Sequence, residues 1–311
     1  MFAFVFPGQG SQRVGMGRAL ADAYPAARDT FAEAEEALGQ PLSTLCWEGP
    51  EETLTLTENT QPAILTASIA AYRALESEGL TEGAAFMAGH SLGEYSAHVA
   101  AGTFSFADAL RTVRRRGQYM QDAVPVGTGA MSAILGLDAA QVAQACVEAA
   151  QGEIVSPANL NGGGQVVIAG TKAAVERAGV RARELGARRV IPLPVSAPFH
   201  CALMKPAEDR LAPDLRGLRS GTPRVPVVAN VDAELKRDGA ASIDALIRQV
   251  SSAVRWEDVV RRLASEGVTA YVEVGSGNVL SGLIRKIDRD AAVASVGTPE
   301  DIAGARALLS R

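Results

Sequence analysis

Hydrophobic positions along this chain form short apolar runs that alternate with longer stretches of helical spacing. Apolar runs of strand length occupy 2–6 and 84–88, and each leads through a glycine-containing turn into a helical stretch. Helical spacing or high alanine and leucine content predicts further helices at 16–24, 26–38, 62–78, which begins with a proline, and 106–123. Strands and helices that alternate in this way predict an α/β fold.

The pattern changes at about Pro125, where the order becomes strand, helix, strand, strand, helix, strand. These elements are expected at 129–136, 139–151, 154–159, 165–170, 171–186 and 189–195, with a hairpin across the glycine-rich turn 161–164. That order is typical of a ferredoxin-like unit. We therefore expect an α/β-hydrolase-like large subdomain formed by 1–124 and 196–311, with 125–195 inserted as a ferredoxin-like small subdomain. The large subdomain should also hold strands at 225–231 and 270–274 and a helix at 279–287.

Composition limits the possible classes of function. The chain has 311 residues, 47% of them hydrophobic and 21% charged, which is typical of a folded globular protein. Its net charge of -5 gives no general attraction to nucleic acid or an anionic membrane, so neither is expected as a partner. Cys46, Cys146 and Cys201 fit neither a disulfide framework nor a zinc site and favour a reduced cytoplasm. No export signal or membrane-spanning run is expected.

The strongest chemical signal is Gly89-His90-Ser91-Leu92-Gly93, which matches the G-x-S-x-G nucleophile elbow. Small residues and chance can produce this pattern, but here it lies between the expected strand 84–88 and an alanine-rich helix. The two glycines allow a sharp turn that holds the serine hydroxyl at the mouth of the sheet and at the positive end of the helix. Ser91 is therefore the candidate nucleophile.

A serine hydroxyl needs a base to take its proton, and the chain has three histidines. His90 adjoins Ser91, so its side chain should point away, and we expect a packing residue. His98 lies two helical turns further on, roughly 10 Å from the serine by helical rise. His200 remains, in a loop directly after the inserted unit, where a cleft between two subdomains would form. We expect His200 to be the base, and its neighbour Cys201 to be a buried thiol rather than the nucleophile.

Attack of the serine on a carbonyl also needs two N–H donors for the oxyanion that forms. Leu92, the residue after the nucleophile, is expected to supply one, and the turn Gly8-Gln9-Gly10 is the candidate for the other. A dinucleotide-binding fingerprint is the competing interpretation of this turn. It fails because Arg13 stands where the third glycine is required.

Four motifs stand together in the order of one known family: Phe6-Pro7-Gly8-Gln9-Gly10-Ser11-Gln12, Gly89-His90-Ser91-Leu92-Gly93-Glu94, Arg116-Gly117 and Phe199-His200. With these motifs the chain resembles the malonyl-CoA:acyl carrier protein transacylases of dissociated (type II) fatty acid synthesis over essentially its whole length. The resemblance implies an S-malonyltransferase that works in two half-reactions, from coenzyme A to a serine and then to the phosphopantetheine thiol of a carrier protein. It implies no bound cofactor.

The resemblance also implies roles for the catalytic residues. Ser91 resembles the acylated nucleophile and His200 its general base and acid. Gln9 and Leu92 resemble the backbone oxyanion donors, and Gln249 resembles the glutamine whose backbone carbonyl orients the histidine. An acidic third member of the triad is therefore not expected.

The expected acyl pocket follows from the same resemblance. Arg116 matches the arginine that binds the free carboxylate of malonate, a task that suits a planar guanidinium. Phe199 resembles the bulky residue of malonyl-selective members, and Met120 and Val279 are candidate pocket walls, although either could be plain core. The remaining arginines of the basic helix are expected on its solvated face: Arg111, Arg114 and Arg115.

Carrier proteins of this family are acidic, so basic residues near the cleft should guide a transient complex. The candidates, which could equally be ordinary surface charge, are Arg188, Arg189, Arg285, Lys286 and Arg289. A serine esterase or thioesterase, an acyltransferase of a polyketide pathway and a non-catalytic carrier-docking scaffold are the alternatives. A monomer is the default expectation.

Overall fold

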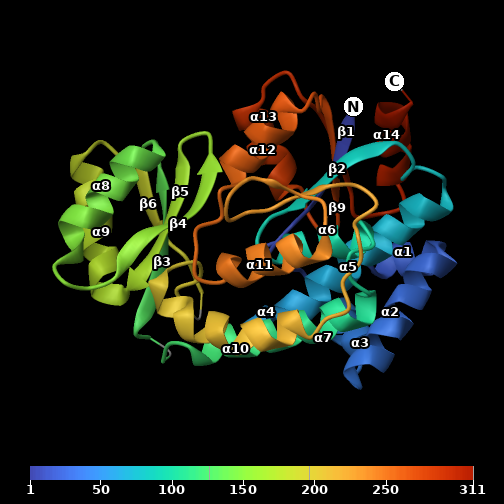
Figure 1. Cartoon of the computed structure of the whole chain (residues 1–311), viewed down its shortest axis with the longest axis horizontal. Coiled ribbons are helices and arrows are strands. Elements are labelled where there is room, and N and C mark those ends of the chain that lie inside the picture. The colour runs from blue at the N-terminus through green and yellow to red at the C-terminus, as the bar shows by residue number, and fades with distance from the viewer. Residues whose placement is uncertain (126, 196, 311) are drawn as a thin grey trace.

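The larger part of the molecule is built on a six-stranded sheet in the order β10-β9-β1-β2-β7-β8 (Figure 1). The computed structural model describes residues 1–125, 127–195 and 197–310. The strands are β1 (Phe2–Phe6), β2 (Ala84–Gly89), β7 (Val227–Val228), β8 (Leu235–Lys236), β9 (Ala270–Val274) and β10 (Ala292–Val296). Neighbouring strands are parallel except that β8 runs antiparallel to β7. The turn that carries Ser91, the candidate nucleophile, leaves the carboxyl end of β2, where sites of open parallel sheets are typically found.

Both faces of this sheet are covered, which explains why β1 is an unbroken apolar run. Phe4 and Phe6 belong to one hydrophobic cluster, and Ala3 and Val5 to another on the opposite face. The helices of the large subdomain are α1 (Arg18–Ala23), α2 (Pro25–Leu38), α3 (Leu42–Glu48), α4 (Glu51–Thr55), α5 (Thr57–Ser77), α6 (Leu92–Ala100), α7 (Phe106–Asp122), α10 (Lys205–Arg216), α11 (Gly239–Gln249), α12 (Trp256–Ser265), α13 (Val279–Ile287) and α14 (Asp301–Leu309), with the short turn η1 (Ala202–Met204).

The inserted part forms its own four-stranded antiparallel sheet, in the order β4-β5-β3-β6. Its elements are β3 (Gly129–Leu135), α8 (Ala139–Ala150), β4 (Val155–Gly162), β5 (Gln165–Thr171), α9 (Lys172–Glu184) and β6 (Arg189–Pro192). Figure 1 shows α8 and α9 on the outer face of this sheet, where they share a separate core with Ile134 and Ile168. The expected α/β-hydrolase-like fold with a ferredoxin-like insert is confirmed. The exact subdomain boundaries stay a prediction, and Ser196 lies outside the described residues.

The two sheets are joined beside the active site. Asn159 in β4 forms an isolated bridge with Val254, in the segment between α11 and α12. The N–H of Leu160 donates to the carbonyl of Val254 at 2.8 Å, and the N–H of Val254 donates to the carbonyl of Ala158 at 2.8 Å. The small subdomain is thus fixed by backbone hydrogen bonds to the segment that follows Gln249.

The start of α5 corrects the sequence prediction. The helix was expected to begin at Pro62, yet it begins at Thr57 and contains that proline. Pro62 has no N–H to donate to the carbonyl of Glu58 four residues earlier, and Arg114 Nη1 in α7 donates to that carbonyl instead, at 3.0 Å. Arg114 also bonds to Asn59, so it packs between helices and does not lie on a solvated face as expected.

A close approach of α7 to α5 makes this contact possible. A Cβ at Gly117 would lie 2.6 Å from the Cα of Glu58, so only glycine fits there. The approach brings Arg116 of α7 beside Gln61 of α5. None of the helices formed by the described residues is both long and apolar enough to cross a membrane.

Candidate active site

Ser91 lies in the turn between β2 and α6 in a backbone conformation that side chains rarely adopt, with φ 53° and ψ -106°. Such a conformation costs about 1–3 kcal/mol and persists only where the surroundings impose it. Two glycines make the turn possible: a Cβ at Gly89 would overlap the backbone of Gly93, and a Cβ at Gly93 would overlap the carbonyl oxygen of Phe6. The turn therefore needs glycine at both positions, as the elbow motif predicts.

The side-chain amide of Asn230, which follows β7, bonds to the backbone of this turn. Its Oδ1 accepts a hydrogen bond from the N–H of Ser91 at 2.7 Å, and its Nδ2 donates to the carbonyl of Gly89 at 2.7 Å. Asn230 is fully buried. One side chain thus bonds to the backbone on both sides of His90 and helps to impose the strained conformation.

His200 lies next to the serine hydroxyl. Its Nε2 is 2.6 Å from Ser91 Oγ, and its Nδ1 is 3.0 Å from the backbone carbonyl of Gln249. Because that carbonyl can only accept, Nδ1 carries the proton and Nε2 is left to accept from the hydroxyl. Burial and the nearby Arg116 charge lower the pKa of His200 to about 3, so the ring is neutral at pH 7. The arrangement can take a proton from Ser91 without any acidic third residue.

Arg116 is the most unusual buried group of the site. It is 2% exposed, and its Nη1 donates to Gln61 Oε1 at 2.7 Å. Its Nη2 donates to Gln249 Oε1 at 2.9 Å and to Ser91 Oγ at 3.1 Å. Both glutamine oxygens are neutral, no carboxylate pairs with Arg116 among the described residues, and Nε has no hydrogen-bond partner there. Burial lowers the pKa of Arg116 from its ordinary value. The ring of Tyr95, with its centroid 5.4 Å away, is a weak partial compensation.

A cavity of about 110 Å³ opens onto these groups. Besides Ser91, His200 and Arg116, its lining includes the predicted residues Gln9, Leu92, Met120 and Phe199. Gln249 lies behind the cavity wall, in contact with Arg116 and His200. Val279 does not line this cavity. It lies in a second one of about 140 Å³ that shares Gln9, His90 and Asn159 with the first.

The other sequence candidates lie away from the reacting hydroxyl. The Nε2 of His90 contacts Asn161 Oδ1 at 2.9 Å, and its ring packs against Trp256. His98 is fully buried beside Thr103. Burial raises the pKa of the Cys201 thiol to about 11, and its Sγ donates to the Pro198 carbonyl. Within the described ranges, no group of three or more His, Cys, Asp or Glu side chains is placed to hold a metal ion.

Three residues of the site carry no local signal that reveals their part. Gln61 is the fifth residue of α5, Asn230 follows the very short β7, and Glu94 was visible only as the last letter of the elbow motif. All three are buried polar side chains. Of the three, Asn230 stands in an apolar run, 225–231, and a polar residue inside such a run is the sequence feature that could have indicated it.

Comparison with known proteins agrees with this fold. The class is that of the acyl transferases, because the family described as acyl transferase domain matches residues 3–304. Malonyl CoA-acyl carrier protein transacylase from Escherichia coli K12 is 53% identical over 307 residues, which cover 99% of each chain. The chain belongs to the family of malonyl CoA-acyl carrier protein transacylases.

Solved structures lead to the same family. An acyl carrier protein S-malonyltransferase from Vibrio cholerae is 51% identical with a TM-score of 0.95, over 97% of this chain and 99% of that chain. A malonyl-transacylase solved in complex with its type II PKS acyl-carrier protein is 49% identical with a TM-score of 0.96, over 100% of this chain and 99% of that chain. The family resemblance drawn from the sequence is confirmed.

Proposed function

We propose that this chain transfers a malonyl group from malonyl-CoA to the phosphopantetheine thiol of an acyl carrier protein, through a malonyl-serine intermediate at Ser91. One observation carries the proposal: Ser91 Oγ lies 2.6 Å from His200 Nε2 and 3.1 Å from Arg116 Nη2. A base and an unpaired buried cation on the same hydroxyl suit an acyl group that ends in a carboxylate.

In the first half-reaction, His200 Nε2 takes the proton of the Ser91 hydroxyl while Oγ attacks the thioester carbon. The carbonyl electron pair moves to oxygen, and the N–H groups of Gln9 and Leu92 stabilise that oxyanion. The intermediate then collapses, the C–S bond breaks, and His200 returns its proton to the departing coenzyme A thiolate. Malonyl-Ser91 remains.

The second half-reaction runs the same steps with a different thiol. His200 takes the proton of the carrier's phosphopantetheine thiol, whose sulfur attacks the malonyl-Ser91 carbonyl. When the intermediate collapses, the ester C–O bond breaks and His200 protonates Ser91 Oγ. The carbonyl of Gln249 holds the imidazole in the tautomer that both halves need.

Arg116 supplies the preference for malonyl. The malonyl carboxylate binds its guanidinium, and this contact places the thioester carbon at Ser91 Oγ. Phe199 and Met120 narrow the cavity around the acyl chain. A small neutral acyl group leaves Arg116 buried without an anion, which is unfavourable.

The partner that follows is an acyl carrier protein in fatty acid synthesis, with polyketide assembly as the alternative pathway. The net charge of -5 means that an acidic carrier must meet local basic residues. The predicted candidates for this contact are Arg188, Arg189, Arg285, Lys286 and Arg289. The chemistry needs only groups of the protein, a thioester donor and a thiol acceptor, so we propose no resident cofactor, and the three free cysteines fit a reducing cytoplasm.

Incubation with labelled malonyl-CoA and holo-carrier tests the function. Malonyl transfer predicts label on the carrier, and omission of the carrier predicts a malonyl adduct on the peptide that holds Ser91, absent in Ser91→Ala. The Ser91 and His200 pair would also serve a thioesterase, which would release free malonate rapidly. Label that stays on coenzyme A would exclude both enzymes.

A further inference from the structure

Glu94 is a fully buried carboxylate directly behind the reacting groups. It stands in the first turn of α6, three residues after Ser91. Its Oε2 accepts hydrogen bonds from Gln249 Nε2 at 2.7 Å and from the N–H of Asn230 at 3.0 Å. Its Oε1 has no hydrogen-bond partner among the described residues. A carboxylate placed so deeply without a cation is costly, so its position calls for an explanation.

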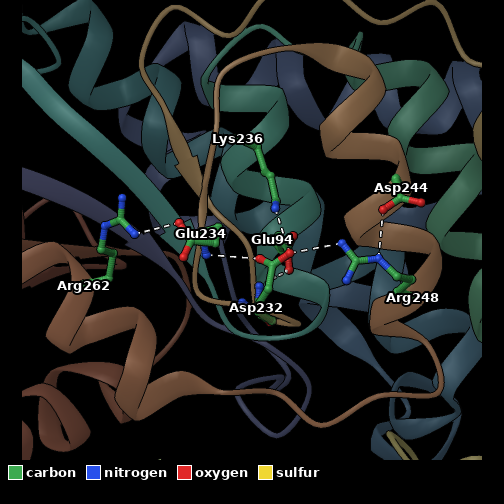
Figure 2. A network of polar contacts seen from close by, with 8 residues as sticks. Glu94, Asp232, Glu234, Lys236, Asp244, Arg248 and Arg262 are labelled. Carbon is green, nitrogen blue, oxygen red and sulfur yellow. Dashed lines mark hydrogen bonds and ion pairs between the residues drawn. The ribbon is translucent and has the colours of Figure 1, made fainter.

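Two cations of the surface network beside Glu94, Lys236 and Arg248, pair with another carboxylate. Figure 2 shows Lys236 and Arg248 directed at Asp232, and their contacts with Asp232 Oδ2 measure 2.8 Å and 3.1 Å. Arg262 in the same view pairs with Glu234. Glu94 therefore takes no part in the surface ion pairs. Its two hydrogen-bond donors are neutral: the side-chain amide of Gln249 and the backbone N–H of Asn230.

The Gln249 amide connects Glu94 to the acyl site. Its Nε2 donates both to Glu94 and to the carbonyl of Ser91, at 3.0 Å, while its Oε1 accepts from Arg116. Two acceptors on one side and a cationic donor on the other allow only one orientation of this amide. Reversed, the amide would direct its NH2 group at the guanidinium and its oxygen at the Glu94 oxygen.

We propose that Glu94 is a positioning residue for malonyl selectivity: through Gln249 it fixes the guanidinium of Arg116 where the malonyl carboxylate must bind. The proposal rests on the function proposed above. His200 does not depend on the side chain of Gln249. Its imidazole bonds to the backbone carbonyl of Gln249, which α11 holds independently of the side-chain amide. Loss of Glu94 should therefore affect acyl selectivity more than the reactivity of Ser91.

Replacement by glutamine separates the hydrogen bond from the charge. One oxygen, Oε2, accepts both hydrogen bonds of Glu94, and a glutamine side chain keeps one oxygen at that place. We expect Glu94→Gln to retain malonyl selectivity and Glu94→Ala to lose it. The control is Glu234→Gln, an exposed carboxylate of the same region that touches none of these groups.

The experiment measures kcat/KM with malonyl-CoA and with acetyl-CoA, and inactivation by an uncharged sulfonyl fluoride that reports on Ser91 alone. A lost hydrogen bond to a charged network predicts a decrease of about tenfold or more for malonyl-CoA in Glu94→Ala, and less than about threefold for acetyl-CoA and for inactivation. Glu94→Gln and Glu234→Gln should stay within about threefold of the parent on all three measures. Equal losses for both thioesters, or a loss in Glu94→Gln as large as in Glu94→Ala, would overturn the proposal.

A second variant keeps the test valid if Glu94→Ala does not fold. Gln249→Met removes the amide and keeps the backbone carbonyl, so it should reproduce the malonyl-specific loss. Where both single variants fold, the double variant should lose no more than either, since they break the same chain of contacts; additive losses would count against it. If the parent protein itself transfers no malonyl group, the proposed function fails. If the parent is active and selectivity is unchanged in the variants, only the positioning role fails.

Discussion

Replacement of Glu94 by glutamine should change how folding stability depends on pH. Burial raises the pKa of Glu94 from an ordinary 4.5 to about 7. An acid with a higher pKa in the folded than in the unfolded chain binds its proton more tightly when folded. The free energy of unfolding therefore falls as pH rises from about 4.5 to about 7. This rise in pKa corresponds to about 3 kcal/mol of stability, which is fully lost above about pH 8.

The groups that face Glu94 set the size of this effect. Burial is the largest cause of the raised pKa of Glu94, and the Asp232 charge raises it further. Hydrogen bonds from Gln249 and Asn230 and the Arg116 charge lower this pKa. Glutamine does not titrate, so the free energy of unfolding of the Glu94→Gln variant lacks this pH dependence. The new NH2 group adds an offset that is independent of pH, because Oε1 has no partner within the described structure.

Urea unfolding of the parent and Glu94→Gln at about pH 5 and about pH 8.5 measures the effect. We expect the stability of the variant relative to the parent to rise by about 2–3 kcal/mol between these pH values. His98 and His200, whose pKa values burial lowers to about 3, destabilise both proteins in acid and cancel in the difference. A stability difference that is the same at both pH values would refute the reasoning that burial opposes ionisation of Glu94.

Three further substitutions test the site and the turn. Arg116→Ala should abolish malonyl transfer and spare or raise acetyl transfer, because the proposed task of this cation, binding the acyl carboxylate, has no counterpart with acetyl-CoA; side-by-side kcat/KM values check this, and equal losses would contradict it. His200→Ala should slow formation of malonyl-Ser91 by about 10²–10⁴-fold in mass spectrometry of the adduct, and an unchanged rate would require another base. Gly93→Ala should lower the free energy of unfolding by about 3 kcal/mol or more, because its Cβ would overlap the Phe6 carbonyl; denaturant unfolding within about 1 kcal/mol of the parent would show that the turn can relax.

Elements with a strong local signal were predicted well from the sequence. The strand at 270–274 and the helix at 279–287 agree with β9 and α13 to the residue. The start of α5 was not predictable locally, because Arg114, more than fifty positions away, bonds to the carbonyl that Pro62 leaves free. The strand expected at 225–231 reduces to Val227–Val228, and β8 and β10 were not expected. Their pairing depends on neighbours distant in the sequence.

The residues of the candidate site likewise divide into those with a local sequence signal and those that depend on distant contacts. Ser91 came from its motif and His200 from elimination among three histidines, and the structure brings the two within hydrogen-bond distance. Gln249 came only from the family resemblance, because a glutamine at the end of a helix has no distinctive pattern. Gln61 and Asn230 remained unnoticed, since their parts depend on contacts with residues more than fifty positions away.

The unpaired burial of Arg116 explains why this site suits an anionic acyl group in particular. The cost of removing its guanidinium from water is met when the protein folds, through two glutamine oxygens and a tyrosine ring rather than a carboxylate. In the proposed reaction, a malonyl carboxylate that enters therefore meets a desolvated cation already in position, with no internal ion pair to break. An internal carboxylate on Arg116 would have stabilised the empty site and competed with the substrate. Glu94 is held one amide away from Arg116, close enough to orient it and too far to neutralise it by direct contact.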